Sequence, residues 1–235
     1  RLLRIAQAAD APVILSPITC RDSLFELEQA RKRGQSAYAT TCPHYPLLDD
    51  SVYYEGENAG RFVCSPPLRD RSQQEPLWKA LRRDSIQAVA SSHRSFTLRQ
   101  KESDPQDFTA IPAGLPGAEN RGELLYTFGV SARRLAPEDL CRVLSEAPAR
   151  LCGLYPKKGV LQPGSDADIV VYDPRASHVI RADDSLSRSD YNPYEGFVTT
   201  GGITQVYLRG RLAVDQGAVL PAPDGRYLPR GKNSL

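Results

Sequence analysis

The stretch Gln87-Ala88-Val89-Ala90-Ser91-Ser92-His93-Arg94-Ser95-Phe96 decides the fold of this chain. Its apolar part, residues 86–90, stops at a cluster of small and polar residues, which is the pattern of a buried strand that ends in a loop. In a parallel α/β fold, the chemistry lies at the carboxyl ends of such strands. A strand followed by an ordinary polar loop would give the same pattern, so the surrounding sequence has to distinguish the two.

Two similar units precede this stretch. Residues 13–15 are a short apolar run, and residues 36–41 read as a second strand. Helices are predicted at residues 22–33 and at residues 73–83, where the second helix carries Trp78. This alternation of strands and helices predicts βα units and a parallel sheet, and hence an α/β fold class.

Three such units leave the sheet incomplete. Three parallel strands cannot close a barrel or cover both faces of a doubly wound sheet, so their outer edges would lack partners. The chain contains no methionine and residue 1 is arginine, whereas a complete translated chain normally begins with methionine. We therefore expect the N-terminal part of the protein to precede residue 1.

The second half of the chain no longer alternates strands with helices. A long loop over residues 97–118 leads to predicted helices at about 119–133 and 137–146. From Val160 onward the pattern is that of an all-β satellite, and residues 221–235 are predicted to be extended or bound to a partner. We therefore divide the chain into residues 1–155 and residues 156–235. Strands of the second part are predicted at residues 168–173, 178–180, 204–208 and 211–214, the last two joined as a hairpin by Arg209-Gly210.

Composition excludes several classes of protein. The net charge is only +2, and the basic residues are scattered, so no nucleic-acid-binding surface is expected. No apolar run approaches the roughly 18 residues of a membrane span. The five cysteines form no Cys-x-x-Cys pair, which favours a reduced, cytoplasmic setting, and three histidines are too few for a His-rich metal cluster.

Several motifs resemble those of the dihydropyrimidinases and hydantoinases, which are cyclic-amide hydrolases of the amidohydrolase superfamily. Residues 11–20 are similar to their sixth-strand segment, and residues 41–45 resemble the mouth of their next strand. Allantoinases and dihydroorotases share the architecture, but the match to dihydropyrimidinase and hydantoinase is better and runs over nearly all of the chain. The other matching motifs are Cys64-Ser65-Pro66-Pro67-Leu68-Arg69-Asp70, Gly114-Leu115-Pro116-Gly117, Gly164-Ser165-Asp166-Ala167-Asp168-Ile169-Val170 and Asn192-Pro193-Tyr194-Glu195-Gly196.

This resemblance implies a TIM (β/α)8 barrel with a β-sandwich domain built from both ends of the chain, usually in a tetramer. Residues 1–155 would supply barrel strands six to eight, and residues 156–235 would supply most of one sandwich and the C-terminal tail. In the family, zinc is held by residues that would lie upstream of this chain, and two metal ions activate a bridging water. For this chain itself we expect no metal cofactor.

The residues that would touch metal or substrate depart from the family pattern. Pro17 stands where the family has a metal-binding histidine, and proline has no side-chain donor atom. Ser92 stands at the position of the aspartate that contacts the metal and shuttles the proton, and a neutral hydroxyl cannot do this work unaided. Ala113 replaces an asparagine that binds the substrate ring and offers only its backbone, whereas Ser65 matches a serine whose backbone faces the substrate.

The histidines give weaker signals. His93 follows the proton-shuttle position and is interpreted as a packing or loop-anchoring residue rather than a ligand. His44, at a strand mouth, is interpreted as a loop histidine that makes a hydrogen bond, and His178 is expected to be exposed.

Two functional hypotheses follow, from different classes. In the first, the chain has the dihydropyrimidinase-like fold without catalysis and acts as a structural or assembly subunit, as the collapsin response mediator proteins of this family do. Its partners would be its own N-terminal half or homologous subunits, in a homo- or hetero-oligomer. In the second, an upstream half supplies the metal ligands, and the assembled protein hydrolyses a cyclic amide such as dihydrouracil or hydantoin. A third reading, a fragment of a decayed gene, also stays open.

Overall fold

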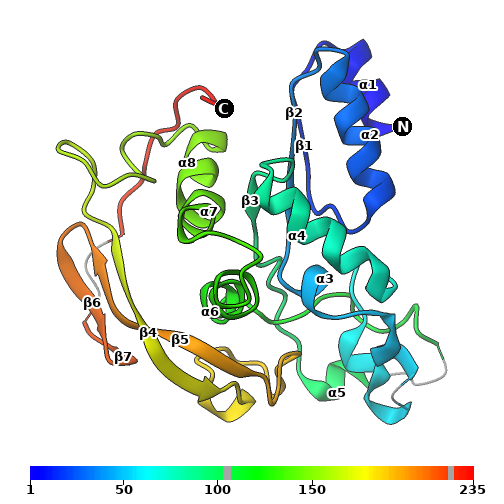
Figure 1. The fold of residues 1–235 in the computed structure, drawn as a ribbon. Coiled ribbons are helices and arrows are strands. Elements are labelled where there is room, and N and C mark those ends of the chain that lie inside the picture. The colour runs from blue at the N-terminus through cyan, green and yellow to red at the C-terminus, as the bar shows by residue number, and fades with distance from the viewer. Residues whose placement is uncertain (55, 103–106, 222–224) are drawn as a thin grey trace.

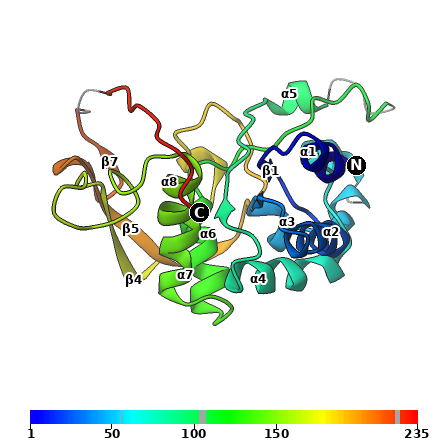
Figure 2. The ribbon, with the colours of Figure 1, turned by 90° about the horizontal axis from the view of Figure 1, so that it is seen from above.

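The computed structural model describes residues 1–54, 56–102, 107–221 and 225–235. Figure 1 shows a parallel sheet with its helices on one side of the molecule and an antiparallel sheet on the other. A group of helices, α6 to α8, lies between the two sheets, and Figure 2 shows the same arrangement from above. Within the described residues, no helix is long and apolar enough to cross a bilayer.

The parallel sheet has the order β1 (Val13–Leu15), β2 (Ala37–Thr41), β3 (Ala88–Val89). The three predicted strands are therefore confirmed, although only two residues of the last run form regular ladder pairs. Backbone bonds continue beyond them, because the amide of Gln87 donates to Ala39 O at 3.0 Å and that of Ala90 donates to Thr41 O at 2.8 Å. Both outer strands, β1 and β3, have one open edge among the described residues.

Arg31 clamps the amino ends of β2 and β3. Its guanidinium donates to Ala37 O at 2.7 Å, to Ser85 O at 2.9 Å and to the Gln87 side-chain oxygen at 2.8 Å. The same Gln87 oxygen accepts the amide of Ala39 at 2.9 Å. Because these groups are partly or wholly removed from water, each bond fixes the strand register more strongly than an exposed one would.

Three helices cover one face of the parallel sheet: α1 (Leu2–Ala8), α2 (Arg21–Lys32) and α4 (Gln74–Arg82). Leu24, Leu27 and Ala30 are the buried residues of α2, at the three-residue spacing of one helical face. Trp78 of α4 is buried, and its indole donates to Pro46 O at 3.2 Å. Helices α2 and α4 agree with the predicted ranges 22–33 and 73–83 to within one residue at each end.

The connections contain short helices that periodicity does not reveal. They are α3 (His44–Leu47), α5 (Leu98–Lys101) and the 3₁₀ helices η1 (Asp50–Tyr54), η2 (Gly56–Phe62) and η3 (Arg71–Gln73). Helix α5 corrects the prediction of a plain loop over residues 97–118. A reciprocal cap starts it: Gln100 N donates to Thr97 Oγ1 at 3.3 Å, and Thr97 N donates to Gln100 Oε1 at 2.8 Å.

The central helices form two continuous runs. The first is α6 (Arg121–Leu125), which passes into the π-helical turn η4 (Tyr126–Ser131). The second is α7 (Pro137–Cys141), the π-helical turn η5 (Arg142–Glu146) and α8 (Ala147–Leu151). Both predicted helices are confirmed, but the second extends five residues further than expected, through α8 and its Pro148.

The antiparallel sheet has the order β4 (Ile169–Val179), β5 (Val198–Leu208), β6 (Arg211–Asp215), β7 (Ala218–Val219). The two strands predicted at 168–173 and 178–180 are wrong as separate elements, because β4 runs through both. A register irregularity between Asp173 and Ser177 absorbs the Pro174-Arg175 segment that resembled a turn. The described residues of this part form one four-stranded sheet, so the expected sandwich stays a prediction, as does the division at residue 155.

The C-terminal residues return to the helical part of the molecule. Gly231 N donates to Gly153 O at 2.7 Å, and the side chain of Arg230 donates to Cys152 O at 2.9 Å. The hydroxyl of Tyr38, on β2, donates to Leu235 O at 3.1 Å. The predicted extended tail is confirmed for residues 225–235, which contain no helix or strand, and its contacts tie it to α8 and the parallel sheet.

Replacing Gly153 with alanine should loosen this tail. A Cβ there would lie 2.1 Å from Gly231 O, and the φ of +66° already disfavours side chains. The matched control is Gly34→Ala, with a similar φ of +82° but nothing within 4 Å of the added atom. We expect Gly153→Ala to lower the free energy of unfolding by about 1–3 kcal/mol more than the control does, and to speed proteolysis of the tail. Equal effects of the two variants in urea unfolding would contradict the tail contact.

Candidate functional site

The carboxyl ends of the three parallel strands meet at one edge of the sheet. Residues 16–20 follow β1, residues 42–44 follow β2 and residues 90–94 follow β3. Pro17 follows β1 and Ser92 follows β3, so the two residues lie on either side of the mouth of β2. The strand-mouth edge defined by these three segments is the candidate site.

The mouth of β1 is held by backbone and hydroxyl bonds. Ile18 N donates to Thr40 O at 2.7 Å, and the Thr41 hydroxyl donates to Ile18 O at 2.8 Å. Thr40 Oγ1 donates to Ser16 Oγ at 2.7 Å. Pro17 is half-buried between these anchored residues and contributes no donor atom to the edge.

A buried thiol lies at the mouth of β2. Cys42 is 1% exposed, and burial raises the pKa of its thiol to about 12, with Cys64 adding to the effect and Arg121 and Ser92 opposing it. Ser92 is exposed, has a left-handed φ of 47°, and interacts with this thiol through its hydroxyl. Arg121 donates to Val89 O at 3.3 Å, so its guanidinium lies at the carboxyl end of β3. At neutral pH this group contains a neutral thiol, a neutral hydroxyl and one cation.

His93 anchors a loop, as predicted. Its Nδ1 accepts the amides of Gly117 at 3.2 Å and Ala118 at 3.3 Å, and its backbone forms a parallel bridge with Leu115. Two donated bonds occupy the Nδ1 lone pair, so that nitrogen is unavailable to an ion.

The other histidines differ from each other. His44 is the first residue of α3 rather than a loop residue, and its ring packs 4.3 Å from that of Tyr45. Burial lowers the pKa of His44 to about 4, so it is neutral at physiological pH. His178 is exposed, as expected, but it also contacts Glu123 of α6.

The predicted substrate-facing residues lie near this edge. Gly114 N donates to Val63 O at 3.0 Å and Arg94 N donates to Leu115 O at 2.9 Å, which brings the segments of Ser65, Ala113 and Ser92 side by side. Ser65 is exposed. Ala113 is half-buried, and its carbonyl accepts Arg94 Nη1 at 3.4 Å.

A buried lysine behind these segments was not found by sequence reasoning. Lys101 is 0% exposed, and its ammonium donates to Val63 O at 2.7 Å and Pro112 O at 2.8 Å. Burial lowers its pKa to about 8. Lys101 and Ala113 line a mostly apolar cavity of about 650 Å³, together with Tyr53, Cys64, Phe108 and Ile111. The capping box at Thr97 was the one local signal that an ordered helix would hold this lysine.

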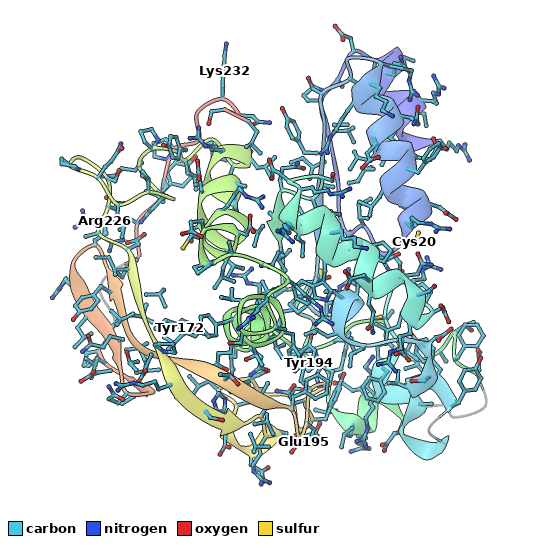
Figure 3. The ribbon with its side chains drawn as sticks, in the orientation of Figure 1. Cys20, Tyr172, Tyr194, Glu195, Arg226 and Lys232 are labelled. Atoms are coloured by element: carbon cyan, nitrogen blue, oxygen red, sulfur yellow. The ribbon has the colours of Figure 1, made fainter. Side chains whose placement is uncertain are left out.

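Cys20 is the other unusual thiol of this edge. It is the N-cap of α2, its Sγ lies 3.3 Å from Ser23 Oγ, and Figure 3 shows it at the start of the helix. Partial burial acts to raise the pKa of Cys20, but hydrogen bonds with Ser23 and the charge of Arg69 outweigh burial, so the pKa lies below its ordinary value.

These donors do not fit a divalent metal ion. Among the residues that the structure describes, no three His, Cys, Asp or Glu side chains come together as ligands. A thiol binds metal as thiolate, and the pKa of Cys42 opposes its ionisation. Proline and a neutral hydroxyl replace the stronger donors at the two flanking strands.

Comparison with known proteins identifies the family. The model of the amidohydrolase family matches residues 23–213. The chain belongs to the amidohydrolase family. It is 39% identical to D-phenylhydantoinase of Escherichia coli O81 (strain ED1a) over 233 residues, which is 98% of this chain and 50% of that protein.

Solved structures of this amidohydrolase group have the same fold over nearly the whole chain. A D-hydantoinase superposes with a TM-score of 0.95 at 36% identity, covering 99% of this chain and 51% of that chain. The dihydropyrimidinase from Brevibacillus agri NCHU1002 superposes with a TM-score of 0.90 at 34% identity, covering 93% of this chain and 48% of that chain. The resemblance to hydantoinases and dihydropyrimidinases is confirmed. The chain spans about half the length of the relatives it matches.

The two unusual thiols should react in opposite ways. We expect iodoacetamide to label Cys20 faster than Cys42, because the pKa of Cys20 is lowered whereas burial raises that of Cys42, and to leave Cys42 unlabelled until the protein unfolds. Ser23→Ala should raise the pKa of Cys20 and shift its labelling profile to higher pH. Mass-spectrometric mapping of the labelled cysteines checks both, and native Cys42 labelled as fast as Cys20 would contradict the described site.

Proposed function

We propose that this chain is a hydantoinase- and dihydropyrimidinase-like amidohydrolase polypeptide without a hydrolytic centre of its own, which acts as a structural or assembly subunit. The observation that carries the proposal is the pair of residues flanking the mouth of β2, Pro17 and Ser92. By family resemblance these are the positions of a metal-binding histidine and of the proton-shuttling aspartate. Losing the proton shuttle alone is expected to remove roughly 10²–10⁴-fold of rate.

Three neighbouring groups, Cys42, His44 and His93, offer no replacement. Cys42 stays protonated, His44 is buried and neutral, and Nδ1 of His93 is committed to two backbone amides. A base must be able to accept a proton within hydrogen-bonding reach of the substrate, and none of these groups combines both properties. Ala113 has no side-chain group to bind a ring, and its carbonyl is turned to Arg94.

The fold-determining residues are intact, which favours a role in assembly. The open edge of β1 faces a groove of about 550 Å³ whose lining includes Leu2, Ile14, Leu15 and Pro17. Leu2 and Ile5 are each 56% exposed and Ile14 is 46% exposed, so this edge presents apolar side chains to solvent. An unpaired strand edge with apolar neighbours favours association with further strands.

The antiparallel sheet presents a second apolar surface. Val170, Val206, Val214 and Val219 pair in register across its four strands and therefore share one face; we call this row the valine stripe. Val170 and Val219 are 55% and 60% exposed. We propose that the chain's own N-terminal half or homologous subunits cover the β1 edge and the valine stripe, in a homo- or hetero-oligomer within the cytoplasm.

An activity assay tests the catalytic part of the proposal. Purified protein supplied with zinc should not open the ring of dihydrouracil or of hydantoin faster than zinc alone does. Ser92→Ala should change nothing, and neither should the control Ser95→Ala, which removes another exposed hydroxyl of the same loop. Zinc-dependent ring opening that Ser92→Ala abolishes and Ser95→Ala preserves would overturn the proposal.

Light scattering tests the assembly part. The chain by itself should self-associate, and Ile14→Lys or Val170→Lys should shift it toward smaller species by placing a charge on each apolar surface. Leu161→Lys is the matched control, because Leu161 is 68% exposed in a loop outside both surfaces. A monodisperse monomer, or equal effects of all three variants, would contradict the assigned surfaces.

A further inference from the structure

Helix α6 packs on the antiparallel sheet through a close contact. The ring of Tyr126, just after α6, stacks on Tyr172 of β4 with centroids 4.7 Å apart, and Figure 3 shows Tyr172 between the sheet and α6. Thr127 Oγ1 donates to Thr200 O at 3.1 Å and accepts Thr200 N at 3.0 Å. Gly201 is required here, since a Cβ would lie 2.6 Å from the Tyr126 ring.

A row of three interacting side chains, Glu123, His178 and Thr199, crosses this contact. His178 Nε2 of β4 lies 3.4 Å from Glu123 Oε2 of α6. On its other side, His178 Nδ1 lies 2.9 Å from Thr199 Oγ1, which is also 3.2 Å from His178 O. Thr199 is fully buried, so its hydroxyl has no access to bulk water.

The Thr199 hydroxyl can satisfy both protonation states of the imidazole. When the ring is neutral, the hydroxyl donates to Nδ1 and Nε2–H faces the Glu123 carboxylate. When the ring takes a proton from solvent, Nδ1–H donates to Thr199 Oγ1, and the hydroxyl proton turns to His178 O. The imidazolium then forms an ion pair with Glu123, and no polar group of the three residues loses its partner.

Other charged groups near the pair are already engaged. Glu119, which precedes α6, accepts Ser185 Oγ at 2.9 Å and Leu186 N at 3.1 Å. Arg121 of α6 turns to Val89 O, Asp173 and Arg175 of β4 contact each other, and β5 has no charged residue. Burial raises the pKa of Glu123, with His178 opposing and Glu119 adding to the effect, so its carboxylate gains from a nearby cation. Burial and Glu123 raise the pKa of Tyr172, which stays neutral.

We propose that Glu123, His178 and Thr199 form a proton-operated latch that holds the antiparallel sheet more tightly to α6 when His178 is protonated. Because stability that depends on a bound proton is lost as pH rises, the contact weakens as the imidazole loses its proton. At lower pH, protonation of Glu123 ends the ion pair, so the strength of the contact passes through a maximum.

Hydrogen exchange of the full chain tests the latch. Amide protection in residues 177–179 and 198–200, corrected for intrinsic exchange, should fall about two- to fivefold from pH 6 to pH 8. His178→Gln and Glu123→Gln should each flatten this profile. Thr127→Val, which removes the Thr127–Thr200 bonds of the same contact, should lower protection at every pH and leave the profile's shape unchanged.

Two results would overturn the latch. One is a wild-type profile without pH dependence in these residues, and the other is a pH dependence that His178→Gln retains. An NMR titration of the His178 ring gives a second measurement that does not depend on variants. Its midpoint should shift to lower pH in Glu123→Gln, and an unchanged midpoint would count against the ion pair.

Discussion

The Arg31 guanidinium, held between β2 and the segment that enters β3, is the interaction on which the site depends. It reaches Ala37 O, Ser85 O and the Gln87 side chain from one position on α2. Because Gln87 also accepts the amide of Ala39, the register of the two strands is fixed at their amino ends. In a parallel sheet that register determines which side chains meet at the opposite edge, and here it brings Cys42 to Ser92.

The amidohydrolase fold is present, and the family resemblance implies that its chemical edge differs at Pro17 and Ser92. The backbone anchors of the strand mouths remain, including Thr41 on Ile18 and His93 on Gly117. The positions that would contact an ion or proton carry proline, a hydroxyl and a protonated thiol. Under the proposed function the anchors alone are sufficient, since packing and register do not depend on catalytic chemistry. The same reasoning places the functional surfaces of the proposal at the β1 edge and the valine stripe rather than in a cleft.

The sequence predicted the elements whose signal is local. The strands at 13–15 and 36–41 and the helix that carries Trp78 show hydrophobic periodicity, and the structure contains them. Strand β4 was split in the prediction, whereas pairing with β5 carries the strand through the Pro174-Arg175 segment. Helix α5 was missed although Thr97 and Gln100 have the spacing of a capping box, a signal that was present and unused.

Local sequence patterns could not predict the contacts between residues that are distant in the sequence. Cys42 and Arg121 lie far apart in the sequence, and the pair formed by Glu123 and His178 joins a helix to the antiparallel sheet. The buried state of Lys101 likewise depends on carbonyls at Val63 and Pro112, which only the folded chain places together. Family resemblance located Pro17, Ser65, Ser92 and Ala113, but their neighbours and protonation states required the structure.

The zinc content per chain tests the central claim most directly. Protein purified without added metal is incubated with zinc, dialysed and measured by elemental analysis, alongside a variant carrying Cys141→Ser and Cys152→Ser, which removes the two exposed thiols as adventitious zinc ligands. The account predicts that this variant retains no zinc above a buffer control. Near-stoichiometric zinc that survives dialysis in the variant would contradict it and would mean that the strand-mouth edge has rebuilt a metal site.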